Sequence, residues 1–342
     1  MSLLNDAPLE LLDRVVIAGG EARRQRGSCN MLQLPGGELL VIYRHAVGKN
    51  RMPNGAVMLT RSTDGHNWDE AIPLYASPGW DCGGLSGMRL LPDNSIIMFL
   101  AQMAVTPVEG MVSEISTTHT FMTRSTDGGH SWSQFGDAIR LFPAITEFWG
   151  HGPVLQLVDG RLLFGVIGTQ KGYSQWTSAV VYSSDNGDSF HDLSIIADEP
   201  GPDYCDNDII RLEDGRLLAL IRTEQPPFDC WQSYSDDDGR TWSPITRTGF
   251  KAGGMTLLRL RDGSIISAHR DREPDRPGVA IYHTTNNAES WRYAGQIYEG
   301  THWYCGYVNF ATMPGGTLFC SYFTSLEDGN SDVQGAFLKD LT

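Results

Sequence analysis

Arginine, carboxylate, histidine and aromatic residues stand at the ends of apolar segments in this sequence, where strands would give way to loops. Those before an apolar segment include Arg26, Asp81, Trp149, His151, Asp206 and Tyr307, and those after one include Arg44, His45, Arg222 and Arg270. A guanidinium group binds a carboxylate through two parallel hydrogen bonds, and aromatic faces pack on sugar rings. If these loop ends converge, the residues predict a pocket for an acidic sugar.

Each of these residues also has a purely structural interpretation. His45 and His151 could be buried, hydrogen-bonded histidines, or they could transfer protons or bind sugar hydroxyls, because imidazole titrates near neutrality. Trp149 could pack in the core. Arg222 could form a structural ion pair with a neighbouring carboxylate. The position of each residue in the fold must therefore decide between the alternatives.

The strands that would position these residues come from two interleaved repeats. In the first repeat, two apolar runs flank an Asp-Gly, Gly-Gly or Asp-Asn pair, which accepts positive φ at low cost and so predicts a tight hairpin. The six copies span residues 32–44, 88–102, 155–168, 210–222, 257–270 and 311–323.

The second repeat follows the first and has the pattern S-x-D-x-G-x-x-W/F, called an Asp-box. RSTDGGHSW at 124–132 is its fullest copy, and the others span 61–68, 183–190, 235–242 and the degenerate 284–291. The hydroxyl and carboxylate can bond turn amides, glycine permits the reversal, and the aromatic ring can pack between sheets. We therefore expect these acidic residues to be structural and not catalytic.

Together the repeats predict an all-β fold, a six-bladed β-propeller of four-stranded antiparallel blades. The sixth unit lacks an Asp-box, and residues 11–18 can supply its missing strand, so that the N-terminal strand closes the ring. The whole chain, 1–342, is then one domain. The tight turns and Asp-boxes would share one face, and the long loops that carry the polar residues would share the other.

Composition excludes several classes of partner. The net charge of −15 disfavours nucleic acid and anionic membrane surfaces. The N-terminal residues lack the features of a signal peptide, which predicts a cytoplasmic protein, or a secreted one if a signal was removed beforehand. The six cysteines include no CxxC pair, so we expect buried free thiols, no metal site and no cofactor.

Five Asp-boxes on a six-unit frame resemble the sialidase (neuraminidase) superfamily over nearly the whole chain. The resemblance implies a hydrolase that binds a sugar carboxylate with three arginines and attacks with a tyrosine activated by a glutamate. YVNFATMPGG places the nucleophile at Tyr307. CDNDIIRLEDGRLLALIR places its partner at Asp206, where the family has glutamate, and the second arginine at Arg222.

Two parts of the family pattern fit less well. The third arginine corresponds to Arg270, with Arg272 and Arg276 as alternatives, and the RIP motif of the first is absent, which leaves Arg26 one position early. The loop at 44–58, where the family places its acidic aspartate, contains no carboxylate. Either Asp81 of the following loop is the acid/base, or the chemistry is not that of a sialidase.

Three hypotheses follow. The first is an exo-acting glycosidase for an acidic sugar, with Tyr307, Asp206, Asp81 and His151 in the chemistry and Arg26, Arg44, His45, Arg222, Arg270 and Trp149 in substrate binding. The second is a lyase acting on uronic-acid polysaccharides through tyrosine and histidine chemistry, which the missing acid favours. The third is a propeller that binds a glycan without chemistry.

Overall fold

The computed structural model describes residues 4, 7–19, 24–47, 53–106, 114–136, 139, 154–170, 175–324, 326 and 330–342. The regular elements of this part of the chain are all β-strands, and every pairing between them is antiparallel. The predicted all-β class is therefore confirmed. Consequently no helix there is long and apolar enough to cross a membrane.

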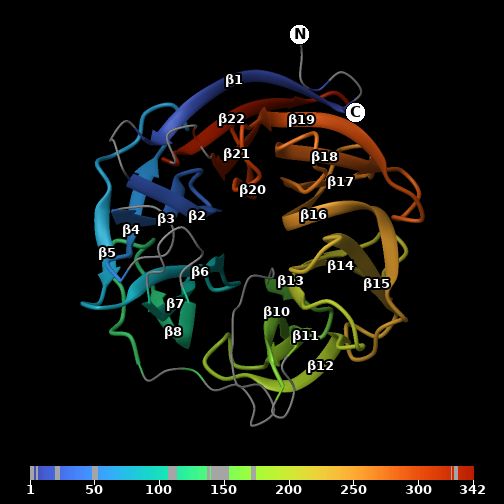
Figure 1. The fold of residues 1–342 in the computed structure, drawn as a ribbon, viewed down its shortest axis with the longest axis horizontal. Helices are drawn as coiled ribbons and strands as arrows, with labels where there is room; N and C mark the ends of the chain where they lie inside the picture. Colours follow the sequence, from blue (N-terminus) through green and yellow to red (C-terminus); the bar gives the residue numbers. More distant parts are fainter. Residues whose placement is uncertain are drawn as a thin grey trace.

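The strands form antiparallel units in chain order. The first unit is β2 (Arg24–Gln33), β3 (Leu39–Val47), β4 (Ala56–Ser62) and β5 (Ile72–Ala76); the second is β6 (Asp81–Leu90), β7 (Ile96–Thr106) and β8 (Glu114–Ser125); the third is β9 (Val154–Gln156), β10 (Leu162–Thr169), β11 (Trp176–Ser183) and β12 (His191–Ala197). Figure 1 shows the units side by side around the middle of the molecule, with β5 and β12 at the periphery.

The next seven strands form one continuous sheet. They are β13 (Tyr204–Arg211), β14 (Leu217–Thr223), β15 (Asp229–Ser235), β16 (Thr246–Arg259), β17 (Ile265–Asp271), β18 (Gly278–Thr284) and β19 (Arg292–Glu299). The long strand β16 changes partner along its length: Lys251 pairs with β15, whereas Ala252 pairs with β17. The sheet therefore consists of two four-stranded units that share β16.

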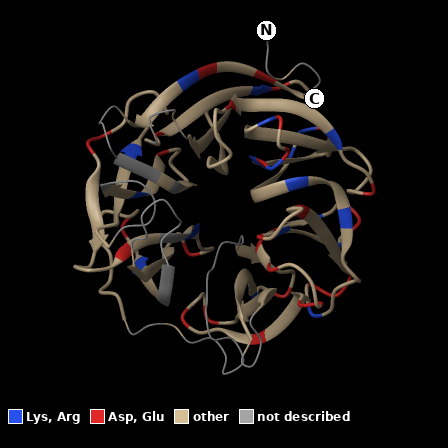
Figure 2. Cartoon of the chain, in the orientation of Figure 1, with Lys and Arg blue, Asp and Glu red and all other residues tan. Residues whose placement is uncertain are grey.

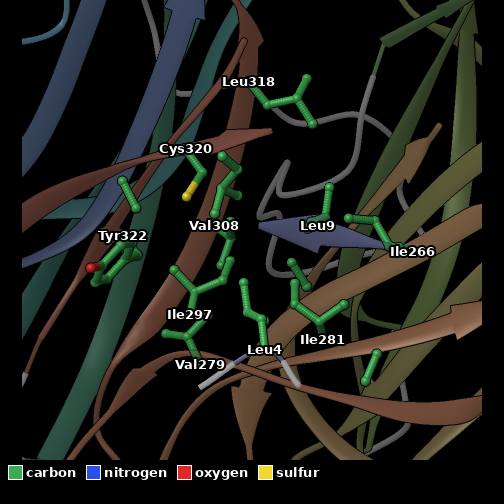
Figure 3. Close-up of a cluster of buried hydrophobic side chains, with 14 of the residues drawn as sticks. Leu4, Leu9, Ile266, Val279, Ile281, Ile297, Val308, Leu318, Cys320 and Tyr322 are labelled. Carbon is green, nitrogen blue, oxygen red and sulfur yellow. The ribbon is translucent and has the colours of Figure 1, made fainter. Parts of the chain in front are cut away.

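Both ends of the chain contribute to one further sheet. It is formed by β20 (Gly306–Thr312), β21 (Leu318–Phe323), β22 (Val333–Asp340) and β1 (Leu9–Ala18), with β1 paired to β22. Leu9 of β1 packs in a buried cluster with Ile266, Ile281 and Val308, which joins this sheet to β16–β19 (Figure 3). The N-terminal strand is thus held both by its sheet and by the neighbouring one.

Local hydrogen bonds explain the two repeats. In the first hairpin turn Leu34 N donates to Glu38 O and Gly37 N donates to Leu34 O, both at 2.8 Å, with Gly37 at φ +91°. The same pair of bonds recurs in the turns that begin at Leu91, Leu157, Leu212, Leu260 and Met313. The six predicted hairpins are confirmed.

In the Asp-boxes, side-chain hydrogen bonds stabilise the turn. Ser125 Oγ donates to Asp127 Oδ1 and accepts from Gly129 N, each at 2.8 Å, and Ser131 N donates to the same carboxylate oxygen at 2.9 Å. Trp132 packs against the cluster between the first and second units. In the next box, bonds from Ser189 hold the pKa of Asp185 down to about 2. The predicted structural role of the boxes is confirmed.

Apolar side chains fill the spaces between successive units. In the described part of the chain, six large buried clusters each join two neighbouring units, and one of them joins β20–β22 to β2–β4 through Tyr43, Phe319 and Phe323. All six cysteines are buried and unpaired, as predicted. Because these clusters hold the faces of successive sheets together, core packing fixes the positions of the innermost strands.

Candidate functional site

Five innermost strands, β2, β6, β13, β16 and β20, carry an irregularity in their pairing, and in all but β6 two residues lie opposite one. The pairing shifts between Gly27 and Asn30 in β2, Tyr204 and Asn207 in β13, Gly253 and Thr256 in β16, and Gly306 and Asn309 in β20. A β-bulge bends its strand and redirects the side chains within it. Asp206 and Tyr307 lie inside two of these bulges.

The bulged strands surround a central cavity of about 370 Å³. Its lining comes from β2, β6, β9, β13, β16 and β20, the innermost strand of every unit, and includes Asp206 and Tyr307. Farther along β13, Asp208 faces the same cavity and accepts a hydrogen bond from Leu257 N at 2.5 Å. Burial raises the pKa of Asp208 to about 7. Asp206 and Tyr307, the two residues predicted to react, therefore line the same cavity.

Tyr307, Asp206 and Arg222 form a connected group at this cavity. The Tyr307 hydroxyl donates to Asp206 Oδ2 at 3.3 Å, and Arg222 Nη1 lies 3.2 Å from the same oxygen. Arg222 Nη2 pairs with Glu224 Oε2 at 2.7 Å, and Arg222 Nε is buried without a hydrogen-bond partner. The structure thus brings together three of the residues that were predicted to converge, although Tyr307 and Asp206 are 101 positions apart in the chain.

The electrostatics of the group determine the state of the phenol. Burial, reinforced by the Asp206 charge, raises the pKa of Tyr307 to about 12, although Arg222 and Arg270 act in the opposite direction. Burial alone would lower the pKa of Arg222, but the charge of Asp206 holds it well above its usual value. At neutral pH the phenol keeps its proton, so a nucleophilic Tyr307 needs a base, and Asp206 is in hydrogen-bond contact with it.

Two further arginines lie among aromatic rings beside Tyr307. Arg270 is 3% exposed, donates from Nε to Cys305 O at 2.5 Å, and lies 5.6 Å from the centre of the Tyr307 ring. The Arg272 guanidinium lies 4.6 Å from the Phe228 ring and 4.2 Å from the Trp303 ring, and its Nε is buried without a partner. Burial and the charge of Arg270 lower the pKa of Arg272 to about 10. The guanidinium groups thus repel one another, and an anion would relieve that repulsion.

These arginines stand out against an acidic molecule. The net charge is −15, and Figure 2 shows acidic residues on many of the outer turns. An anionic ligand is therefore attracted by the local cluster and not by the protein as a whole. Trp303, which is 42% exposed, offers an aromatic face beside the cluster.

Asp81 and Arg44 form an ion pair with each other. Arg44 Nε lies 2.7 Å from Asp81 Oδ1 and Nη2 lies 3.1 Å from Oδ2, and the two residues are 4% and 0% exposed. This buried bidentate ion pair bears on two expectations. The Asp81 carboxylate and the Arg44 guanidinium face each other, and neither residue lines the cavity that holds Asp206 and Tyr307.

We expect the replacement of Arg44 by methionine to lower the free energy of unfolding by about 3–5 kcal/mol, because Asp81 would remain buried without its counter-charge. Urea denaturation would measure the loss. Arg216→Met removes a half-exposed ion pair with Asp214 and serves as the control, with a loss of no more than about 1 kcal/mol. Equal losses in the two variants would contradict the interpretation of Arg44–Asp81 as a structural pair.

The remaining predicted site residues are less well placed. His45 follows Arg44 on β3 and is half-buried. The main chain of Arg26 pairs with His45, but its side chain lies outside the described part of the structure. Trp149 and His151 also lie outside the described residues.

Sequence reasoning missed the asparagines at the bulges. Asn30 and Asn309 line the cavity, and Asn309 Nδ2 donates to Tyr307 O at 3.0 Å. A lone amide inside an apolar strand, as in NMLQL and NFATM, was the available signal. Within the described residues, no three His, Cys, Asp or Glu side chains gather closely enough to hold a metal ion.

Comparisons with known proteins agree with this architecture. The model of a family described as a BNR repeat-like domain matches residues 87–320. A search of curated proteins found no significant match. Among solved structures, a protein of unknown function from Dyadobacter fermentans DSM 18053 superposes with a TM-score of 0.85 at 19% identity, over 97% of this chain and 99% of that one.

Two sialidases share the fold at lower similarity. The Hadza microbial sialidase Hz136 gives a TM-score of 0.69 at 17% identity, over 91% of this chain and 65% of that one. The sialidase of Trypanosoma rangeli, solved with the inhibitor DANA, gives 0.69 at 14% identity, over 94% and 57%. This chain therefore spans less than two thirds of either sialidase.

Proposed function

Because the chain belongs to the BNR repeat-like domain family, within the sialidase superfamily, we propose that it is an exo-acting glycoside hydrolase for an acidic sugar, either sialic acid or a related one. The observation that carries the proposal is the contact of 3.3 Å between the Tyr307 hydroxyl and Asp206, with Arg222 on the same carboxylate. A tyrosine nucleophile is a known exception to the two-carboxylate pattern of glycosidases.

The proposal includes a closed, six-bladed propeller. Three features support it: β16 serves two four-stranded units, β1 pairs with β22, and apolar clusters join successive units, including the last to the first. In such a ring the innermost strands meet at the axis, so residues from distant parts of the chain can act on one ligand.

In the proposed reaction the sugar carboxylate binds at Arg222, Arg270 and Arg272. Asp206 accepts the phenol proton while Tyr307 Oη bonds to the anomeric carbon, and the bond to the leaving oxygen breaks with its electron pair remaining on that oxygen, which takes up a proton from solvent. Water then replaces Tyr307 at the carbon, the proton on Asp206 returns to Tyr307 Oη, and one proton goes to solvent. A neutral nucleophile suits this substrate because it is not repelled by the sugar carboxylate.

The choice of substrate for an activity assay depends on the leaving group. Since Asp81 is held in its ion pair, an aryl glycoside is the better substrate, because its leaving oxygen needs little help from an acid. We expect the protein to release the aryl alcohol from a 2-linked aryl glycoside of sialic acid and not from the aryl glycoside of a neutral sugar. Measurable sugar binding with no release after long incubation would identify a binding protein without chemistry.

The buried Arg44–Asp81 pair gives a second candidate, a lyase acting on uronic-acid polysaccharides, because it removes the expected acid of a hydrolase. A lyase transfers protons without water and leaves an unsaturated uronate, which absorbs in the ultraviolet. We expect no such absorbance when the protein is incubated with uronic polysaccharides. If this absorbance appears and no aryl alcohol is released from the aryl glycoside, the protein is a lyase and the hydrolase proposal is wrong.

A further inference from the structure

Tyr307 has a backbone conformation that side-chain-bearing residues rarely adopt. Its φ is +53°, and it is the first residue within the bulge of β20. The corresponding first residue in the bulge of β16 is Gly254, with φ +58°. The fold thus places tyrosine where a sister strand has glycine. Such strain persists only when the surroundings hold it in place.

The Tyr307 carbonyl is the point at which it is held. Asn309 Nδ2 donates to it at 3.0 Å, and Cys29 Sγ donates to it at 3.5 Å. Asn309 Nδ2 also lies 3.4 Å from Cys29 O. The side-chain amide therefore takes the place of a sheet hydrogen bond at a position where the pairing of β20 and β21 is interrupted.

Asn30 determines which way the Asn309 amide faces. Met88 N, which can only donate, bonds to Asn30 Oδ1 at 2.8 Å. Asn30 Nδ2 consequently faces Asn309 Oδ1, also at 2.8 Å, and this leaves Asn309 Nδ2 directed at the Tyr307 carbonyl. The chain of bonds runs across three innermost strands, β6, β2 and β20, and neither amide can be flipped without losing a bond.

With the backbone held, the ring has little freedom. A Cβ added at Gly254 would lie 3.1 Å from Cδ1 and Cε1 of Tyr307, so the ring packs directly on that glycine. On another side the ring stacks with Phe323 at 6.0 Å between centroids. The direction of the Tyr307 hydroxyl toward Asp206 therefore follows from the backbone conformation.

We propose that Asn309, oriented by Asn30, is a positioning residue that holds the left-handed backbone of Tyr307 and so aims its hydroxyl at Asp206. The catalytic meaning rests on the proposed function, whereas the geometric effect does not. Misplacement of a reacting group by about 1 Å can cost about 10²-fold in rate. Loss of this support should therefore lower kcat and leave substrate binding nearly intact.

The matched comparison is Asn309→Ala against Gln33→Ala. Gln33 also joins β2 to β20, through Nε2 to Thr312 O at 2.8 Å and Oε1 to Thr312 N at 3.2 Å, but at the other end of the strands. We expect kcat on the acidic aryl glycoside to fall about 10- to 100-fold in Asn309→Ala, with KM changed by less than about 3-fold. Gln33→Ala should retain the kcat of the unaltered protein.

A spectroscopic measurement separates this proposal from the proposed function. In protein labelled with 3-fluorotyrosine, the ¹⁹F signal of Tyr307 is the one lost in Tyr307→Phe. We expect that signal to move in Asn309→Ala and in Asn30→Ala, and to stay in place in Gln33→Ala. If the signal moves but the unaltered protein cleaves no acidic glycoside, positioning stands and the proposed function fails.

An unmoved Tyr307 signal in Asn309→Ala would overturn the proposal, whatever the activity. If Asn309→Ala does not fold, Asn309→Asp is used in its place, because it keeps the size and the acceptor for Asn30 but turns an oxygen toward the Tyr307 carbonyl. We expect the same displaced signal and the same loss of kcat. Unchanged values in this variant would also contradict the positioning role.

Discussion

Replacement of Tyr307 by phenylalanine is expected to lower the kcat/KM for release of the aryl alcohol from an acidic 2-linked aryl glycoside by at least about 10³-fold. The substitution removes one oxygen, the atom that would attack the sugar. The ring can keep its contacts with Gly254 and Phe323, and Asp206 keeps its ion pair with Arg222. The melting temperature should therefore change by no more than a few degrees, roughly that of one lost hydrogen bond.

Tyr322→Phe is the matched control for that variant. Tyr322 is fully buried in the strand next to β20, and its hydroxyl bonds to Gln334 Oε1 at 3.4 Å, away from the site. It should keep the activity of the unaltered protein. Activity retained in Tyr307→Phe would remove the tyrosine from the mechanism, and equal loss in both variants would point to a general disturbance of the fold.

Asp206→Asn is expected to lower kcat by about 10²- to 10⁴-fold, the usual contribution of a general base. The amide keeps the size of the carboxylate and can still accept the phenol hydrogen bond, but it cannot take the proton. Arg222 keeps its partner Glu224, so the variant does not leave a buried cation alone. The control is Asp203→Asn, on the same segment of chain as Asp206. The Asp203 carboxylate accepts hydrogen bonds from Trp176 N and Gln225 Nε2.

The pH profile of Asp206→Asn gives an independent check. Burial is the largest cause that raises the pKa of Tyr307 to about 12, and the charge of Asp206 is the second largest. Removal of that charge should therefore lower the pKa of Tyr307. Without a base, the reaction depends on phenol that has already ionised. Residual activity should therefore rise steadily toward alkaline pH. Activity within about 3-fold of the unaltered protein at neutral pH would exclude Asp206 as the base.

Features that depend on residues close together in the chain could be predicted without the structure. The six hairpins and the Asp-boxes could be predicted because their hydrogen bonds join residues within a few positions, as in Leu34 with Glu38 or Ser125 with Asp127. The contact of Tyr307 with Asp206 could be expected as well, because repeats of constant form bring equivalent strand ends to the same place, and the family resemblance named those positions.

The pairing of charges and amides between distant segments is established by packing and became known from the three-dimensional structure. Arg44 could have faced a ligand, but it lies against Asp81, 37 residues away. Asn30 and Asn309, 279 residues apart, meet because the first and last sheets pack together and because a bulge redirects each strand. Neither pairing leaves a pattern in the sequence, since ion pairs and side-chain hydrogen bonds depend on distances of a few ångströms that packing alone establishes.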